Sequence, residues 1–487
     1  MHKLNLILRA FISAILMIAL FPITGLQTAK AQQSNSKNET IAFVGVNVIP
    51  MDKERVLKNQ TVLIRAGRIA EIGGAGSLKV PPEALQIDGR GKFLMPGLVD
   101  MHVHLSPGEG ANNDLPSQQL RLLLANGVTT IRSMIGNPSH IAIRDKINKG
   151  EILGPQVFTA GMPLLGNNTP TVEEAVKKVT EQKKAGFDLL KVHEGLKPEV
   201  YDAIVKTARE VGIPVAGHVT PSVGLNRALA AKQTSIEHLD NYLQSAVAPN
   251  AQVEITTSQV VLGETLKHVD EKKLTELARA TSKAGVANNP TLTLFKLVVS
   301  DSKPEEFLKW EEMQYVPAQT RAGFAKQKAG TLNIPGSAEE KKRYIELRNY
   351  LVRELHKAGA KILLGPDSPQ FFLVPGFAAH REMQSLTEAG LSNYAVLEAA
   401  TRNGAENLGM LKEFGTIEKG KRADLLLLDA NPLENIANAK KIAGVMVRGN
   451  WLPKENLAKM LEEVAALHRE TKPQAGTNVS SNSNRRP

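Results

Sequence analysis

The stretch GLVDMHVH, residues 97–104, decides how this chain is organised. It is a short apolar run that ends in a His-x-His pair, His102 and His104. Side chains two residues apart in a β-strand point to the same face. The stretch therefore predicts a strand that delivers two imidazoles to one side, where both can bind one metal ion.

Seven further stretches have the same character, a short apolar run that ends in polar residues. They are GVTTIRSM (127–134), QVFTAG (156–161), FDLLKVH (187–193), IPVAGHV (213–219), TSIEHL (234–239), GVANNPTL (285–292) and KILLGPD (361–367). Amphipathic helical patterns lie between most of them, for example at 171–186 and 198–212. Eight such βα units predict an α/β fold, a (β/α)8 TIM barrel over residues 96–410.

The segment at about 300–360 is longer than the other connections and reads as charged helices. It follows the seventh expected strand, on the face where barrels keep their active sites. Two interpretations remain open from the residues: a lid over the site, or a peripheral helical pair that only adds surface.

Both ends of the chain carry short alternating strands punctuated by Gly and Pro, at 41–95 and at 411–455. Such patterns indicate antiparallel β structure. Because the two β regions flank the barrel, we expect them to join into one small composite β-sandwich.

The first 31 residues have the pattern of a secretory signal peptide. Lys3 and Arg9 precede an apolar run at 10–20, and Ala29-Lys30-Ala31 is a small-x-small cleavage site. Eleven residues are too few to span a bilayer, and no second run of that kind reaches 18 residues, so we expect no stable membrane anchor after cleavage. The prediction is export to a periplasm or beyond. The polar segment 474–487 is expected to be disordered.

Composition excludes several classes of protein. The 487 residues include no cysteine, which excludes disulfides, thiolate metal sites and a cysteine nucleophile. The net charge of +11 is spread along the chain and aromatic residues make up only 4%. Nucleic-acid-binding proteins concentrate their positive charge and interleave aromatic residues, so we expect no nucleic-acid partner.

Further candidate metal ligands lie at the ends of the expected strands: His218, His238 and Asp367. In a barrel these ends converge on one face, and imidazole and carboxylate groups suit zinc, manganese or iron. Lys191 ends the fourth strand, and a protonated amine cannot ligate a metal. It is a surface lysine, a partner of Glu194, or a lysine chemically altered to carry negative charge.

Residues that contact substrate are harder to identify. Arg132 follows the second strand and either pairs with a substrate carboxylate or forms a structural salt bridge. His193 lies two residues beyond Lys191, within reach of a substrate. Glu237 precedes His238, so strand alternation predicts that it faces away from the site, in a structural role.

The motifs PGLVDMHVHL (96–105), GIPVAGHVTP (212–221), TSIEHLD (234–240), LLGPDSP (363–369) and GTIEKGKRADLLLLDANPL (415–433) resemble those of the amidohydrolase superfamily. The chain is most similar to its imidazolonepropionase-like and Xaa-Pro dipeptidase-like branches. The resemblance covers residues 41–455 and says little about substrate.

The resemblance implies a centre of two divalent metal ions, with zinc favoured. His102, His104 and Asp367 would hold one ion, and His218 and His238 the other. Lys191 would be N6-carboxylated and bridge them together with a hydroxide. Asp367 would also act as general base and acid in cleaving an amide or peptide bond of a small-molecule or short-peptide substrate, such as a dipeptide or an N-acyl amino acid.

Other activities remain as alternatives. A lactonase, an ester hydrolase or a cyclic-amide hydrolase would use the same centre, and a catalytically silent exported binding protein would use the same fold. Deaminases of this fold place an acid three residues after the fifth-strand histidine, and Pro221 stands there. Oligomeric state, including a homo-oligomer, is not disclosed by the residues.

Overall fold

The computed structural model describes residues 40–108, 114–248, 251, 253 and 260–469. Clustering of contacts separates residues 1–36 from 37–487, and the first unit lies outside the described residues. The expected signal peptide (1–31) and the expected disordered tail (474–487) are likewise outside them. No helix within the described ranges is long and apolar enough to cross a membrane.

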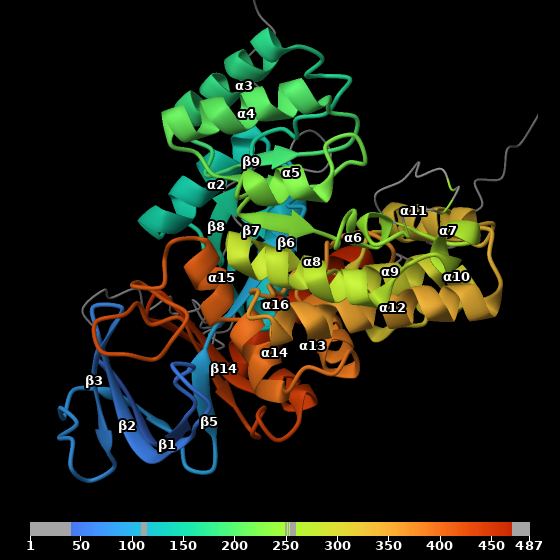
Figure 1. Ribbon diagram of the computed structural model, residues 1–487. Helices are drawn as coiled ribbons and strands as arrows, with labels where there is room; N and C mark the ends of the chain where they lie inside the picture. Colours follow the sequence, from blue (N-terminus) through green and yellow to red (C-terminus); the bar gives the residue numbers. More distant parts are fainter. Residues whose placement is uncertain (1–39, 109–113, 249–250, 252, 254–259, 470–487) are drawn as a thin grey trace, which may run out of the picture. The chain divides into compact units, whose positions relative to one another are not determined.

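Eight strands of the described chain form one mixed sheet from both ends of the sequence (Figure 1). Five come from the N-terminal part: β1 (Ile41–Val48), β2 (Leu57–Arg65), β3 (Arg68–Gly74), β4 (Leu85–Asp88) and β5 (Phe93–Pro96). Three come from the C-terminal part: β13 (Leu425–Leu428), β14 (Ile442–Val447) and β15 (Asn450–Pro453). The two parts join where β13 pairs antiparallel with β5. The expected composite β region therefore exists as one sheet.

This mixed sheet curls around an apolar core. The ring of Phe43 on β1 meets the edge of Trp451 on β15 at 5.2 Å between ring centroids. At the opposite edge, the backbone of β3 bonds back to the segment before β13, through Ile69 N to Lys421 O at 2.9 Å. Buried Ile, Val, Leu and Met side chains fill the interior. Burial of this apolar surface is what holds the two chain ends together.

Seven strands in the described middle section are parallel and lie where the sequence predicts them. The first sheet contains β6 (Leu98–Val103), β7 (Val128–Ser133) and β8 (Gln156–Thr159). The second contains β9 (Leu190–Val192), β10 (Val215–Gly217), β11 (Ser235–Glu237) and β12 (Ala287–Asn289). Two isolated bridges, Ala160 to Leu189 and Leu164 to Val192, link the ends of the two sheets.

The eighth expected strand, residues 361–367, is a bridge at Ile362 and not a regular strand. Its backbone still bonds to both neighbours. Leu363 N donates to Asn288 O of β12 at 2.8 Å, and Met101 N of β6 donates to Leu364 O at 2.7 Å. Gly365 has no room for a side chain, since a Cβ there would lie 2.7 Å from His102 N. This segment therefore runs tightly against β6, which carries the His-x-His pair.

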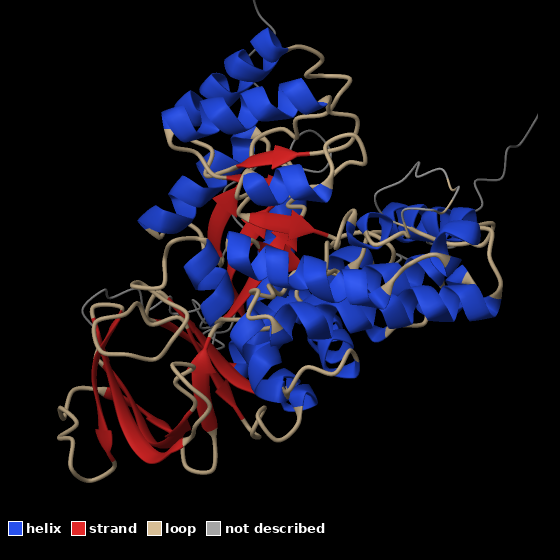
Figure 2. Ribbon diagram, viewed as in Figure 1, coloured by secondary structure: helices blue, strands red, loops and turns tan. Residues whose placement is uncertain are grey.

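Helices follow most of the parallel strands and surround them (Figure 2). Those before the insertion are α1 (Leu115–Ala125), α2 (Pro138–Lys149), α3 (Val172–Ala185), α4 (Pro198–Val211), α5 (Leu225–Ala230), α6 (Tyr242–Ser245), α7 (Glu264–Lys267), α8 (Glu271–Ala284) and α9 (Leu292–Val299). Those after it are α13 (Phe377–Glu388), α14 (Asn393–Ala399), α15 (Arg402–Asn407), a 3-10 helix (Ile436–Lys440) and α16 (Lys454–His468). The helices expected at 171–186 and 198–212 are confirmed as α3 and α4.

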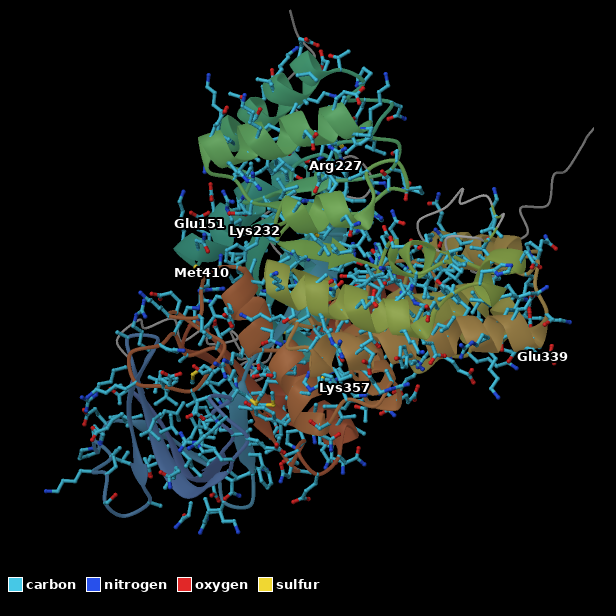
Figure 3. The ribbon with its side chains drawn as sticks, viewed as in Figure 1. Glu151, Arg227, Lys232, Glu339, Lys357 and Met410 are labelled. Atoms are coloured by element: carbon cyan, nitrogen blue, oxygen red, sulfur yellow. The ribbon has the colours of Figure 1, made fainter. Side chains whose placement is uncertain are left out.

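The insertion at 300–360 is helical, as expected. It contains α10 (Pro304–Phe307), a 3-10 turn (Glu311–Tyr315), α11 (Ala318–Thr331) and α12 (Ala338–Lys357). Helix α12 packs against α8, α9 and α13, so this segment is part of the body of the protein. Charged side chains such as Glu339 and Lys357 project from its outer face (Figure 3).

Gly444 on β14 offers a test of the curled sheet. A Cβ at this position would lie 2.1 Å from the ring of Trp451. We expect Gly444→Ala to lower the free energy of unfolding by about 1–3 kcal/mol, because the ring must move out of a packed core. The measurement is denaturant unfolding followed by fluorescence, to which Trp451 contributes as one of two tryptophans.

The matched control is Gly323→Ala in α11, where an added Cβ has no neighbour within 4 Å. Alanine in a helix is favoured over glycine by roughly 0.5–1 kcal/mol, so this variant should be slightly stabilised. Equal stability of Gly444→Ala and the parent would contradict the packing of Trp451 against β14.

Candidate metal centre

The residues expected at the strand ends are brought together in one buried cluster. His102 lies in β6 and His104 directly after it, while Lys191 lies in β9. His218 and His238 directly follow β10 and β11. Parallel strands present their C-terminal ends on one face, so segments far apart in sequence meet here.

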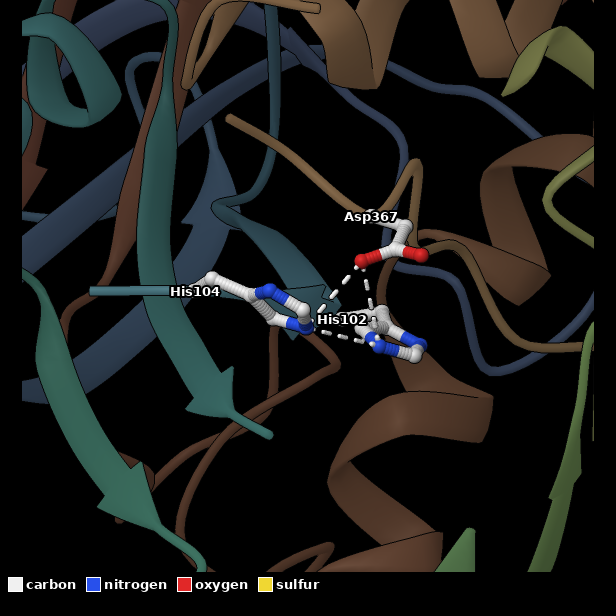
Figure 4. Close-up of side chains that lie close together, drawn as sticks. All are labelled: His102, His104 and Asp367. Carbon is white, nitrogen blue, oxygen red and sulfur yellow. Dashed lines mark hydrogen bonds and ion pairs between the residues drawn. The ribbon is translucent and has the colours of Figure 1, made fainter. Parts of the chain in front are cut away.

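Asp367 contacts three of the histidines. Its Oδ1 lies 3.1 Å from His104 Nε2 and 3.3 Å from His102 Nε2 (Figure 4). Its Oδ2 lies 3.7 Å from His238 Nε2. The two Nε2 atoms of the His-x-His pair are 3.3 Å apart. The expectation that strand periodicity turns both imidazoles to one point is confirmed.

Lys191 and His218 complete the cluster. Lys191 is 1% exposed, and its Nζ lies 3.4 Å from His102 Nε2. The rings of His218 and His238 are 4.8 Å apart between centroids. The structure thus excludes one of the three interpretations of Lys191: it is not a surface lysine, since it is buried with its amine next to His102.

Three of the histidines are held through their other ring nitrogen. The Nδ1 of His102 lies 2.8 Å from Glu237 Oε2, that of His218 lies 2.7 Å from Asp240 Oδ2, and that of His238 lies 2.9 Å from Thr291 Oγ1. A carboxylate can only accept, so the first two Nδ1 atoms donate. Thr291 donates its hydroxyl proton to Pro290 O at 2.8 Å, so its oxygen accepts from His238. From these partners we assign the Nδ1–H tautomer to all three, with the Nε2 lone pair facing the cluster.

These lone pairs make the cluster a fit for cations. The Nε2 lone pair of His102 faces a carboxylate oxygen of Asp367 at 3.3 Å and the Lys191 amine at 3.4 Å. Asp367 Oδ1 is buried and has no hydrogen-bond donor. Two acceptors this close require a proton or a cation between them, so the arrangement suits a cation. Imidazole nitrogens and a carboxylate are also the ligands that zinc and related ions bind in cysteine-free sites.

Burial keeps the ring nitrogens neutral, as metal ligands must be. Desolvation lowers the pKa of His102, His104 and His238 well below the ordinary range, and that of His218 to about 3. Desolvation also lowers the pKa of Lys191. The same cause raises the pKa of Asp367 to about 7.

Glu237 reaches the cluster, although strand alternation predicts that it faces away. The prediction fails because His238 lies beyond β11 with a left-handed backbone, at φ 63°. The chain turns at that residue, so neighbouring side chains can both point inward. Glu237 orients His102, while Asp240 and Thr291, which sequence reasoning missed, orient His218 and His238. No spacing rule in the sequence signals these two, since each is defined by the partner it meets.

Arg132 is a buried neighbour of Glu237, the residue that orients His102. It is 1% exposed. Its Nη2 donates to Glu237 Oε1 at 2.7 Å, and its Nε donates to Met101 O at 2.7 Å. Its Nη1 donates to Ser235 Oγ at 2.9 Å. This geometry favours the salt-bridge interpretation over contact with a substrate carboxylate.

His193 lies beside the cluster and is half-buried. Its ring centroid is 4.0 Å from that of His218. Its Nδ1 accepts the backbone N–H of Glu194 at 2.8 Å, so its Nε2 carries the proton. Burial lowers its pKa to about 3. His193 is thus a neutral hydrogen-bond donor at the site, unlike the three histidines whose Nε2 is an acceptor.

Two groups of side chains in the described residues have ligand atoms close enough for a shared ion. One is His102, His104 and Asp367, and the other is Glu194, His218 and Asp240. The first group contains the three ligands that the resemblance assigns to one ion, whereas the second shares only His218 with those assigned to the other ion.

The chain is similar in sequence to proteins of known activity. Imidazolonepropionase from Thermoplasma acidophilum is 24% identical over 397 residues, which cover 78% of this chain and 85% of that protein. Ochratoxinase from Aspergillus niger is 24% identical over 462 residues, which cover 82% of each chain.

Solved structures share the fold. A bottromycin amidohydrolase superposes with a TM-score of 0.68 over 90% of this chain and 92% of its own, at 23% identity. A Xaa-Pro dipeptidase with bound methionine superposes with a TM-score of 0.62 over 85% of this chain and 100% of its own, at 20% identity.

The resemblance drawn from the motifs is confirmed at the level of the family. The amidohydrolase family model matches residues 93–452, a segment that contains the His-x-His strand and every side chain of the cluster. The chain belongs to the amidohydrolase family, whose members are hydrolases that act on carbon–nitrogen bonds of the amide type.

Proposed function

We propose that this protein is an exported hydrolase with two divalent metal ions, and that it cleaves an amide or peptide bond in a small substrate. The observation that carries the proposal is the convergence of imidazole Nε2 atoms, the Asp367 carboxylate and the Lys191 amine in one buried cluster. Zinc is the ion we favour, because nitrogen ligands dominate the cluster.

The proposed architecture is a closed (β/α)8 barrel over residues 96–410, with residues 361–367 as its eighth strand. Bridges from Ile362 to Asn288 and from Ser368 to Val103 support closure between β12 and β6. The β regions at 41–95 and 411–455 form the second unit. Export rests on the leader pattern at 1–31 alone.

The ligand assignment follows the two halves of the cluster. His102, His104 and Asp367 would hold one ion, and His218 and His238 the other, with Lys191 between them. Burial lowers the pKa of Lys191 and favours its neutral amine. A neutral amine can add CO2 to form a carbamate, whose two oxygens would serve both ions. We therefore propose that Lys191 is N6-carboxylated.

When bound, divalent ions make hydroxide available near neutral pH and polarise the carbonyl of the substrate. Asp367 is placed to accept the proton that attack on the carbonyl releases, and to pass it to the departing amine. Its burial excludes bulk water from that transfer. His193 can donate an Nε2 hydrogen bond to a substrate oxygen, and we propose it as a substrate contact. Arg132 acts on His102 through Glu237 and is not proposed as a substrate contact.

A lactonase or cyclic-amide hydrolase is the second candidate, because the same cluster would attack esters and ring amides. A silent binding protein is disfavoured, since each proposed ligand is present and oriented. Small molecules or short peptides are the proposed partners.

Metal content tests the centre. We expect about two divalent ions per chain in residues 32–487 purified without chelator and with bicarbonate, as measured by elemental mass spectrometry. Lys191→Met should lose at least one ion, because the bridging carbamate cannot form. Lys328→Met removes another buried lysine, which lies in α11 and donates to Ser300 O and Thr331 Oγ1, and this variant should keep both ions. Unchanged stoichiometry in Lys191→Met would remove the carbamate from the proposal.

Turnover tests the role of Asp367. On a substrate found by screening dipeptides, N-acyl amino acids and then lactones, Asp367→Asn should lower kcat by a factor of about 100 or more, since proton transfer contributes about 10²–10⁴-fold. Circular dichroism should show an intact fold. Asp301→Asn, at an exposed carboxylate that pairs with the buried Lys341, is the control and should keep parental kcat. Near-normal turnover of Asp367→Asn would overturn the mechanism.

Metal affinity tests the carboxylate behind His218. Asp240→Asn keeps the shape of the side chain but weakens the hydrogen bond that orients the ring. Loss of such a partner typically costs roughly 10–100-fold in metal affinity. Competition with a chelator measures the change. Asp202→Asn, at an exposed ion pair with Arg227, should bind metal like the parent. Parental affinity in Asp240→Asn would mean that the ring is held by packing alone.

A further inference from the structure

Arg348 is a buried charge that the proposed mechanism does not use. It belongs to α12 of the insertion and is 1% exposed. Desolvation of a charge is costly, so the hydrogen bonds that a buried guanidinium does form matter. Its Nη1 donates to Tyr344 OH on the same helix at 3.3 Å, its Nε has no hydrogen-bond partner, and its other bonds reach the strands. Its partners therefore indicate what it does.

Those partners are the backbone ends of two neighbouring strands. Arg348 Nη2 donates to His238 O at 2.9 Å and to Pro290 O at 2.8 Å. The first carbonyl follows β11 and the second follows β12. The Nη2 atom of Arg348 thus joins the backbone of His238, a proposed metal ligand, to the turn at Pro290 and Thr291.

The backbone at both places is in an unfavourable region. His238 has φ 63° and Thr291 has φ 47°, in the left-handed region that residues other than glycine rarely adopt. Such conformations persist only where surrounding contacts hold them. Arg348 supplies a charged donor to the carbonyl of His238 itself.

The same guanidinium also acts on the partner of the His238 ring. Pro290 O accepts both from Arg348 and from the Thr291 hydroxyl, which in turn accepts from His238 Nδ1. The guanidinium lies 4.0 Å from the ring of Phe295, and that ring is 6.0 Å from the ring of His238. Arg348 therefore contacts the support of His238 at its backbone, its hydrogen-bond partner and its neighbouring aromatic ring.

A carboxylate fixes this turn from the other side. Glu382 of α13 is fully buried and accepts from Leu292 N at 2.7 Å and Thr293 N at 2.8 Å, the first residues of α9. The carbonyl before Thr291 is therefore bound by a cationic side chain of α12, and the amides after it by an anionic side chain of α13. Thr291 lies between these two contacts.

We propose that Arg348 is a positioning residue for His238, and that the insertion braces the metal centre. This inference rests on the proposed function, in which His238 binds metal. It gives residues 300–360 a role that neither a lid nor a peripheral helical pair describes. Substitution of Arg348 should leave the fold intact but weaken the binding of the ion that His238 holds.

Cobalt(II) binding is the test, because its visible absorption reports the coordination of the ion independently of activity. The chain is stripped with chelator and titrated with Co2+ for the parent and for Arg348→Met. We expect the weaker of the two Co2+ ions to bind Arg348→Met at least about 10-fold less tightly than it binds the parent, as when other hydrogen-bond partners of metal ligands are lost. The visible absorption of that ion should change as well. Arg348→Lys restores one charged donor and should recover part of the affinity.

Arg353→Met is the matched control. Arg353 lies on the same helix, donates to Ala389 O at 2.8 Å and lies 5.9 Å from the ring of Tyr350. The Arg353→Met variant loses a similar contact to a backbone carbonyl, but one that involves none of the clustered histidines. It should therefore bind Co2+ like the parent. If Arg348→Met fails to fold, Arg348→Lys against Arg353→Lys gives the same comparison.

The outcomes separate this inference from the function beneath it. A variant at Arg348 with parental affinity and absorption, or an equal loss in the Arg353 variant, overturns the positioning role alone. A parent chain that binds no Co2+ overturns the proposed metal function and the positioning role with it.

Discussion

The repulsion between acceptors at the centre of the cluster is the constraint on which the rest of this structure depends. The Nε2 atoms of His102 and His104 lie 3.3 and 3.1 Å from Asp367 Oδ1, which has no hydrogen-bond partner. Nothing in that arrangement is stable in isolation. It requires surroundings that hold each ring in place, and a proton or a cation between the acceptors makes it favourable.

The surroundings consist of hydrogen bonds to the far side of each ring. Glu237, Asp240 and Thr291 determine which nitrogen of each imidazole carries the proton, so they determine which one is available for metal. Arg132 in turn satisfies Glu237, since a lone buried carboxylate would be costly. Selecting the tautomer in advance is how a protein preorganises a metal site, and it is why these partners matter as much as the ligands.

The helical insertion fits the same reasoning. Its aromatic residues Phe307 and Phe324 pack against Phe372 in the loop that follows Asp367. Its Arg348 bonds to the carbonyl of His238. The insertion therefore contacts the surroundings of two proposed ligands, Asp367 and His238, and links the cluster to the packing of helices outside the parallel sheets.

Much of the fold and of the candidate site was predictable from residue patterns. Strand periodicity places His102 and His104 on one face, and the repeated strand–helix pattern brings His218, His238 and Asp367 to the same end. Alternation along β11 failed for Glu237, because it assumes an extended backbone and His238 is left-handed. The segment 361–367 was expected to be a regular strand, but it forms only one β-bridge, at Ile362. Its backbone runs so close to β6 that position 365 has room only for glycine.

The sequence by itself therefore determined which side chains could bind metal and the order in which the strands deliver them, because both follow from local periodicity. Only the tertiary structure decided how each ring is held and protonated. Asp240, Thr291 and Arg348 have no local signature, since their roles arise from partners that lie 22, 53 and 110 residues away in the chain. A hydrogen bond across such a separation depends on how strands and helices pack, and packing is a property of the whole fold.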